Sequence, residues 1–144
     1  MGNKFFMNRR KSREQAFIFL FESSFELQSV EEIIKEAGDI REDKLDDFSK
    51  SLVDGVLSNT EKIDKYLVNN LNGWQKERLS RTTLTLLRLC IYEILYCEEI
   101  PESVSINEAV ELAKKYGSPE EASYINGVLG SVVKQLGSCK KGDK

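Results

Sequence analysis

Residues 77–96 read ERLSRTTLTLLRLCIYEILY, and the spacing of their apolar side chains decides the fold class. Apolar residues recur every three or four positions, which is the period of an amphipathic helix and not of a strand. We expect its buried face to consist of Leu84, Leu87, Ile91, Ile94 and Leu95. Pro101 should close this helix, because the residue before a proline avoids the α conformation. The stretch therefore predicts one long helix.

The same helical period recurs along most of the chain. No segment alternates apolar and polar residues for long enough to predict a strand. The other helices that we expect cover about 10–25, 29–38, 43–57, 60–71, 105–117 and 118–136. The sequence therefore predicts an all-α protein of six or seven helices.

The chain has 144 residues, which suits a single compact domain with a core of its own. We expect this domain to consist of two packed helical sub-bundles, at about 9–72 and 74–137, joined near 72–76. The residues outside them, 1–8 and 138–144, are expected to form basic, flexible ends.

Two helix starts carry capping sequences. Ser105 and Glu108 have the S-x-x-E spacing of a capping box, and we expect them to open a helix. Ser118 is followed by Pro119 and by Glu121, which supply a cap, a first-turn proline and a first-turn acid. This second pattern predicts a helix start at residue 118.

The chain lacks the residues that most often carry catalysis or bind metals. It has no histidine, the commonest general base, and no glycine-rich phosphate loop. Its three cysteines form no C-x-x-C pair, so they predict neither a disulfide framework nor a zinc site. Cys90 and Cys97 lie seven apart on one helix face and are expected to be small buried apolar groups. We therefore expect no catalytic residues, no metal, no cofactor and no enzyme activity.

No apolar run approaches the length of a membrane span. The stretch AFIFLF, at 16–21, is shorter than the apolar core of a secretion signal, and Glu22 follows it at once. We expect a cytoplasmic protein that does not associate with membranes.

Charge is unevenly distributed along the chain. Residues 1–13 hold five cations and no acid, whereas the whole chain has a formal net charge of −3. Four of the five cations fall within NRRKSRE, at 8–14, where we expect the first helix to start. Cations at that position oppose the helix dipole, so they bring no local benefit. A positive end on a negative body indicates an anionic partner, and a solubilising tail is the plainer alternative.

Polar and small residues interrupt two helix faces in the second half. Arg88 and Glu93 lie five apart, so we expect each to tie its helix to a neighbouring element. Gly127 and Gly130 each cost about 1 kcal/mol relative to alanine within a helix. We expect them to let two helices approach closely, with Asn126 satisfying a loop or a helix end. Direct contact with a ligand is the alternative.

Four stretches, in order, resemble the NusB family of bacterial transcription antitermination factors. They are RRKSREQAFIFLF (9–21), LLRLCIYEIL (86–95), IPESVSINEAVELAKKYG (100–117) and SYINGVLGSVV (123–133). The resemblance implies an all-helical protein of two small bundles that binds boxA RNA jointly with NusE, a protein of the small ribosomal subunit. It also implies entry into an RNA polymerase antitermination complex, notably on ribosomal RNA operons, without catalysis. The stretch INEAVELAK matches a region that faces partners or supports the fold.

The resemblance places RNA binding at the basic start of the first helix. Arginine forks bond phosphate oxygens in pairs, and guanidinium planes stack on unpaired bases. The expected RNA-binding residues are Lys4, Arg9, Arg10, Lys11, Arg13 and Phe21. Phe21 stands where the family often has tyrosine, so it could stack on a base without donating a hydroxyl bond. Thr83 and Gly130 stand where an acid and an aspartate, respectively, are frequent.

Two alternatives to this function remain open. One is a helical protein–protein adaptor that binds no RNA and whose basic start meets an acidic partner. The other is a NusB-like accessory domain of an RNA methyltransferase, whose cofactor-binding part would lie outside these residues. Formation of a homodimer that hides the basic end also stays open.

Overall fold

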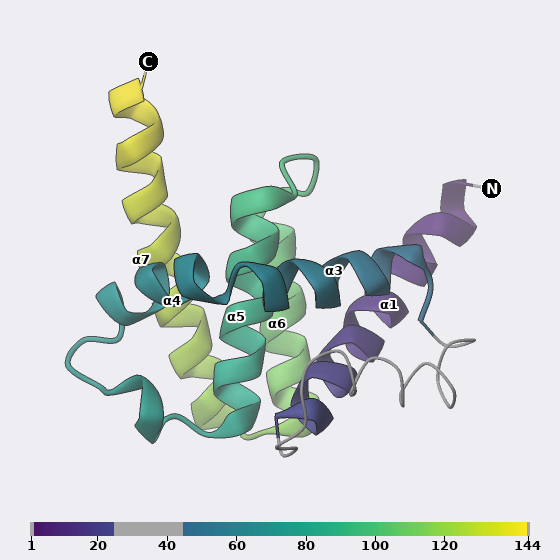
Figure 1. Cartoon of the computed structure of the whole chain (residues 1–144), viewed down its shortest axis with the longest axis horizontal. Helices are drawn as coiled ribbons and strands as arrows, with labels where there is room; N and C mark the ends of the chain where they lie inside the picture. The colour runs from purple at the N-terminus through teal and green to yellow at the C-terminus, as the bar shows by residue number, and fades with distance from the viewer. Residues whose placement is uncertain (1, 25–44, 144) are drawn as a thin grey trace. The chain divides into compact units, whose positions relative to one another are not determined.

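The computed structural model describes residues 2–24 and 45–143, with side chains described for 9–24 and 45–137 (Figure 1). Within these residues every regular element is a helix and no strand occurs. The predicted all-α fold class is confirmed.

The chain divides into two compact units, and the division falls between Ser58 and Asn59. From the sequence we expect a division near 72–76. It falls earlier because α4 (Thr60–Asn69) packs against the helices that follow it, so α4 belongs to the second unit.

The first unit is built on the packing of α1 (Gly2–Ser23) against α3 (Asp47–Ser58). The helix expected over 43–57 corresponds to α3. The buried apolar side chains of this unit are Ala16, Phe17, Phe19, Leu20, Leu52, Val53 and Val56. Together they form a small apolar core between the two helices.

Helix α1 begins at Gly2, well before the expected start near Arg10. We call residues 8–14 the basic segment, and its cations therefore lie in the interior of the helix. The predicted conflict with the helix dipole is wrong, because that effect fades within the first turn. The helix expected over 29–38 lies outside the described residues.

The second unit contains α4, the short 3-10 helix η2 (Lys76–Arg78), α5 (Arg81–Tyr96), α6 (Glu102–Tyr116) and α7 (Pro119–Asp143). Helix α5 packs against α4, α6 and α7, and α6 packs along α7 (Figure 1). Of the five residues expected inward on α5, three are buried and the outer pair, Leu84 and Leu95, is half-buried. The core of this unit also includes Leu86, Leu89, Cys90, Ile125, Val128, Leu129, Val132 and Leu136.

Helix α5 is bounded differently from what the sequence indicated. Ser80 caps its start, with the Ser80 hydroxyl accepting a hydrogen bond of 3.1 Å from the Thr83 amide. The helix ends at Tyr96, and Cys97 is its C-cap residue. Pro101 does not close it, because it stands at the N-cap of α6, where a missing N–H costs nothing.

The two predicted capping sequences have opposite outcomes. Ser105 and Glu108 lie inside α6, which begins at Glu102, so the capping box predicted there is wrong. The start of α7 is confirmed, since the Ser118 hydroxyl accepts a hydrogen bond of 3.1 Å from the Glu121 amide. Helix α7 then continues beyond its expected end into residues that the sequence analysis assigned to a flexible tail.

Candidate nucleic-acid interface

Ser12 holds the basic segment of α1 against the start of α3. Its hydroxyl donates to the Asp46 carboxylate, and its backbone carbonyl accepts a hydrogen bond of 2.9 Å from the Ser49 hydroxyl. The Ser49 amide also donates to Asp46 Oδ1 at 2.8 Å, so this carboxylate caps α3. Ser12 and Ser49 are both buried. These bonds fix which side of α1 faces α3.

Asp46 stays ionised at neutral pH in this arrangement. Burial disfavours its charge, but hydrogen bonds from Ser12 and Ser49 outweigh burial and hold the pKa of its carboxyl below the ordinary value of 3.8. The basic segment therefore rests on a fixed negative charge.

Arg9 and Arg13 lie on the side of α1 that faces Phe48 of α3. Their guanidinium carbons are 4.6 Å and 5.7 Å, respectively, from the centroid of the Phe48 ring. A cation over an aromatic face is attracted by the ring quadrupole. Arg13 is only 5% exposed, whereas Arg9 is half-buried. Direct contact between Arg13 and RNA stays a prediction, because a side chain this deeply buried presents little surface to a ligand.

Arg10 and Lys11 lie on the opposite side of the helix and are exposed. Residues three or four apart share a helix face, so the side chains at 9, 12 and 13 point together toward α3. Those at 10 and 11 point away from α3. We call the exposed pair Arg10 and Lys11 the basic face, and the half-buried Arg9, beside Phe48, borders it. The side chain of Lys4 lies outside the described residues.

Phe21 lies further along α1 and is half-buried. Its ring packs on that of the buried Phe17, with centroids 5.7 Å apart. Eleven residues separate it from Arg10, so the two lie on nearly the same flank, about three turns or roughly 16 Å apart. Glu14 stands between them and is half-buried. An RNA strand that ran along this flank would contact the Arg10 guanidinium and then, about three turns further along, the Phe21 ring.

In the second unit, buried and part-buried polar contacts join α5 to its neighbours. Arg88 donates from Nε and Nη2 to the Asp64 carboxylate of α4, at 2.9 Å and 2.8 Å, and Lys76 Nζ bonds the same group at 3.0 Å. Ser105 of α6 donates to Glu93 at 3.0 Å, and both residues are 2% exposed. The expectation that Arg88 and Glu93 tie their helix to neighbours is confirmed.

The Thr83 hydroxyl donates to Glu121 Oε2 at 2.9 Å. Ser80 donates to the same oxygen at 2.5 Å, so one carboxylate joins the starts of α5 and α7. The Ser80 hydrogen bond lowers the pKa of Glu121, burial opposes it, and Thr83 adds to the lowering. An acid at position 83 would repel Glu121 in this arrangement.

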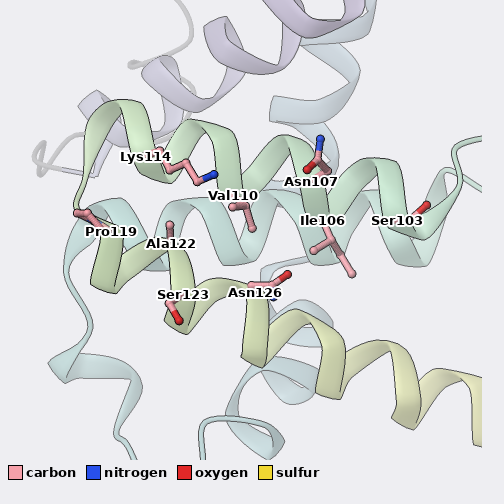
Figure 2. Close-up of a pocket in the computed structure, with 9 residues that line it drawn as sticks. All are labelled: Ser103, Ile106, Asn107, Val110, Lys114, Pro119, Ala122, Ser123 and Asn126. Carbon is pink, nitrogen blue, oxygen red and sulfur yellow. The ribbon is translucent and has the colours of Figure 1, made fainter.

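A groove of about 650 Å³ runs between α6 and α7 (Figure 2). Ile106 and Val110 give it an apolar floor, and the carboxamides of Asn107 and Asn126 stand at its edges. Four members of INEAVELAK thus line it, of which Asn107 and Lys114 are exposed. Asn126 makes no side-chain hydrogen bond to the described residues, so the expectation that it satisfies a loop or helix end is wrong.

Gly127 and Gly130 of α7 do not serve close helix packing. A Cβ atom added at Gly127 or at Gly130 would meet no atom within 4 Å. The expectation that they let helices approach closely is therefore wrong at both positions. Among the described cysteines, Cys90 is buried as expected, whereas Cys97 is only half-buried.

Two other kinds of site do not occur in the described part of the chain. No group of three or more Cys, Asp and Glu side chains there is placed to hold a metal ion. No helix within the same residues is both long and apolar enough to cross a bilayer.

Fold and site together define a class, a small all-helical protein with a candidate nucleic-acid interface on its first helix. The model of the NusB family matches residues 10–134, and the chain belongs to that family. A transcription antitermination protein NusB of Clostridium botulinum (strain Kyoto / Type A2) is 42% identical over 143 residues, covering 88% of this chain and 100% of the relative. That of Listeria monocytogenes serotype 4b is 41% identical over 126 residues, covering 88% and 96%.

Solved structures agree with this assignment. The structure of T. maritima NusB matches with a TM-score of 0.76 and 33% identity, covering 88% of this chain and 90% of that one. A chain from the complex of antitermination factors NusB and NusE with dsRNA matches with a TM-score of 0.76 and 25% identity, covering 88% and 96%. A chain from a structure of a plectonemic RNA supercoil matches with a TM-score of 0.78 and 27% identity, covering 89% and 95%.

Family membership settles the coarse function. The chain is a NusB antitermination factor, and this family is not catalytic. The expectation that the protein is not an enzyme is thereby confirmed. Sequence reasoning missed the roles of Asp46 and Phe48. The D-x-x-S spacing from Asp46 to Ser49 was a readable capping signal, whereas nothing in the sequence paired Phe48 with the arginines.

Proposed function

We propose that this chain binds boxA-type single-stranded RNA through the basic face of α1, together with NusE. In this proposal it then joins an RNA polymerase antitermination complex in the cytoplasm and helps polymerase resist termination on ribosomal RNA operons. Phosphate oxygens would pair with Arg10 and Lys11, while Arg9 adds a guanidinium plane at the same level of the helix.

One observation carries the proposal: Arg10 and Lys11 are exposed on a helix whose orientation is fixed by other residues. The Ser12–Asp46–Ser49 hydrogen bonds and the Phe48 ring hold the opposite side of α1. Cations that are presented by a rigid element lose less conformational entropy on binding than cations on a free tail. The match to a NusB–NusE–dsRNA structure supports the same partner classes.

Two of the matching structures contain RNA described as dsRNA or as a supercoil. The choice of single-stranded over double-stranded RNA therefore rests on a separate observation. A half-exposed Phe21 on the flank of Arg10 favours a single strand, since only unpaired bases can stack on an aromatic side chain. A comparison of single-stranded boxA RNA with the same sequence as a duplex tests this point. Equal or tighter binding of the duplex would favour shape recognition of double-stranded RNA instead.

The direct experiment replaces the two exposed cations. In the double variant Arg10→Gln/Lys11→Gln, RNA affinity should fall on the order of ten-fold or more, because charge-assisted bonds to phosphate are lost. Glutamine keeps the helix propensity of the segment. Binding is measured by fluorescence anisotropy of a labelled RNA, with and without NusE, and circular dichroism checks the fold.

The matched control is Lys65→Gln/Lys134→Gln, which removes the same charge from exposed positions of α4 and α7. It should bind RNA like the parent. If both double variants lose affinity equally, binding follows net charge and the basic face is not the site. If the parent binds NusE but no RNA, the chain is a protein–protein adaptor.

A further inference from the structure

Trp74 is the only tryptophan of the chain. At 60% exposure it is also the most exposed large apolar side chain among the described residues. It lies between α4 and η2, outside the helices. Tryptophan is enriched where proteins bind partners, because its ring offers a large contact area at little entropic cost.

The chain turns sharply just before Trp74 and fixes its position. Asn72 and Gly73 have φ angles of 53° and 89°, both in the left-handed region, and the Trp74 amide donates to the Leu71 carbonyl at 3.1 Å. The indole meets the Tyr124 ring at an interplanar angle of 71°, with centroids 6.5 Å apart. Burial raises the pKa of the Tyr124 hydroxyl, which makes no hydrogen bond to the described residues. The indole therefore packs edge-on against one aromatic ring and leaves 60% of its surface exposed.

A pocket of about 370 Å³ lies beside this ring. It is lined by Asn72, Gly73, Trp74, Gln75 and Arg78. Arg78 is exposed and forms no ion pair with the described residues, whereas the nearby Lys76 is committed to Asp64 at 3.0 Å. The lining thus combines an aromatic ring, two carboxamides and one available cation, without an acid.

We propose that this pocket binds one unpaired nucleotide of an RNA strand, with the base stacked on Trp74 and the phosphate paired with Arg78. The proposal rests on the RNA-binding function proposed above and adds a second contact, in the second unit. Every base has a π face, so an indole can stack on it whatever the sequence. Carboxamides at Asn72 and Gln75 offer both donors and acceptors to a base edge.

Charge complementarity favours a nucleotide over a protein side chain as the occupant. A nucleotide supplies both a flat apolar ring and an anion within one unit, which matches an indole and a guanidinium on one pocket wall. An acidic peptide would satisfy Arg78 but would leave the indole without a planar partner.

The single tryptophan makes the test direct, because its fluorescence reports on this pocket alone. Single-stranded boxA-type RNA is titrated into the full chain, and Trp74 emission is followed beside the anisotropy of labelled RNA. Quenching that saturates together with the anisotropy signal is the expected result.

Variants separate the two contacts. Trp74→Ala should weaken RNA binding about 5- to 150-fold, the range seen when a stacking aromatic is removed, and Trp74→Phe should retain most of the affinity. Arg78→Gln should weaken binding and make it less sensitive to salt. The controls Tyr116→Ala and Arg81→Gln, which change an exposed aromatic and an exposed cation outside the pocket, should bind like the parent.

Three outcomes would overturn the inference, and they can be told apart. If emission stays constant and Trp74→Ala binds like the parent while Arg10→Gln/Lys11→Gln loses affinity, the pocket is not a nucleotide site and the proposed function stands. If the parent binds no RNA, both proposals fall. If NusE and not RNA changes the emission, the pocket serves a protein partner.

Discussion

The guanidinium carbon of Arg9 lies 4.6 Å from the centroid of the Phe48 ring, and that of Arg13 lies 5.7 Å from the same centroid. One aromatic side chain of α3 thus holds two arginines of α1. Since Arg13 is buried and Arg9 is half-buried, the ring acts mainly by setting the position of the basic segment.

Replacing this ring should weaken RNA binding without unfolding the protein. Phe48→Leu keeps an apolar side chain but removes the aromatic face, so affinity should fall about two- to five-fold, the equivalent of one surface cation–π contact. Phe48→Tyr keeps the ring and should bind like the parent. Anisotropy titrations measure both, and thermal melting verifies folding. Equal losses in the two variants would show that the aromatic face plays no part.

The hydrogen bond from Ser12 to Asp46 should contribute to the stability of the first unit. Ser12 is 1% exposed, and Ser12→Ala leaves the Asp46 carboxylate without one of its donors. The free energy of unfolding should fall by about 1–2 kcal/mol, measured by urea denaturation. Ser51→Ala, at an exposed position of the same unit, should cost less than about 0.5 kcal/mol. A control loss as large as that of Ser12→Ala would refute the special role of Ser12.

Acid should destabilise the second unit through Asp64 and Glu121. Burial opposes the ionisation of Asp64, but the hydrogen bonds and charges of Arg88 and Lys76 prevail, and its pKa lies below the ordinary value of 3.8. The pKa of Glu121 likewise lies below 4.5, through the Ser80 hydrogen bond. The unfolded chain therefore binds protons first as pH falls, so this stabilisation is full above about pH 5 and is lost through the folded pKa values.

Asp64→Asn tests that pH dependence. The variant should be less stable than the parent at pH 7, because Arg88 and Lys76 lose their counter-charge. Its free energy of unfolding should then change less than that of the parent between pH 5 and pH 3. Parallel pH profiles for the two proteins would contradict the assignment.

The helices that the sequence predicted well are those whose burial follows one clean stripe. Val128, Leu129 and Val132 repeat at helical spacing and all lie in the core. The ends of the helices were less predictable, because a proline such as Pro101 and a serine such as Ser105 are each compatible with more than one position in a helix. Packing decided between them: the Ser105 hydroxyl bonds the buried Glu93, and α6 begins earlier, at Glu102.

The candidate site could be located from the sequence but not divided into roles. The sequence indicated residues 9–13 as a group, because four of these five positions hold a cation. Which of them face solvent depends on where α3 packs, and that contact is non-local. The expected close packing at Gly127 failed for a similar reason, because a missing side chain does not reveal whether a neighbour fills the space.

The salt dependence of RNA binding tests the central claim most directly, because only contacts with phosphate release counterions. For single-stranded RNA the slope of log K against log salt changes by about 0.7 for each phosphate contact. The slope of Arg10→Gln/Lys11→Gln should therefore be shallower than that of the parent by about 1.4. Lys65→Gln/Lys134→Gln should keep the parent slope. Identical slopes for the parent and the Arg10→Gln/Lys11→Gln variant would contradict the account, because the basic face would then not be in contact with the RNA backbone.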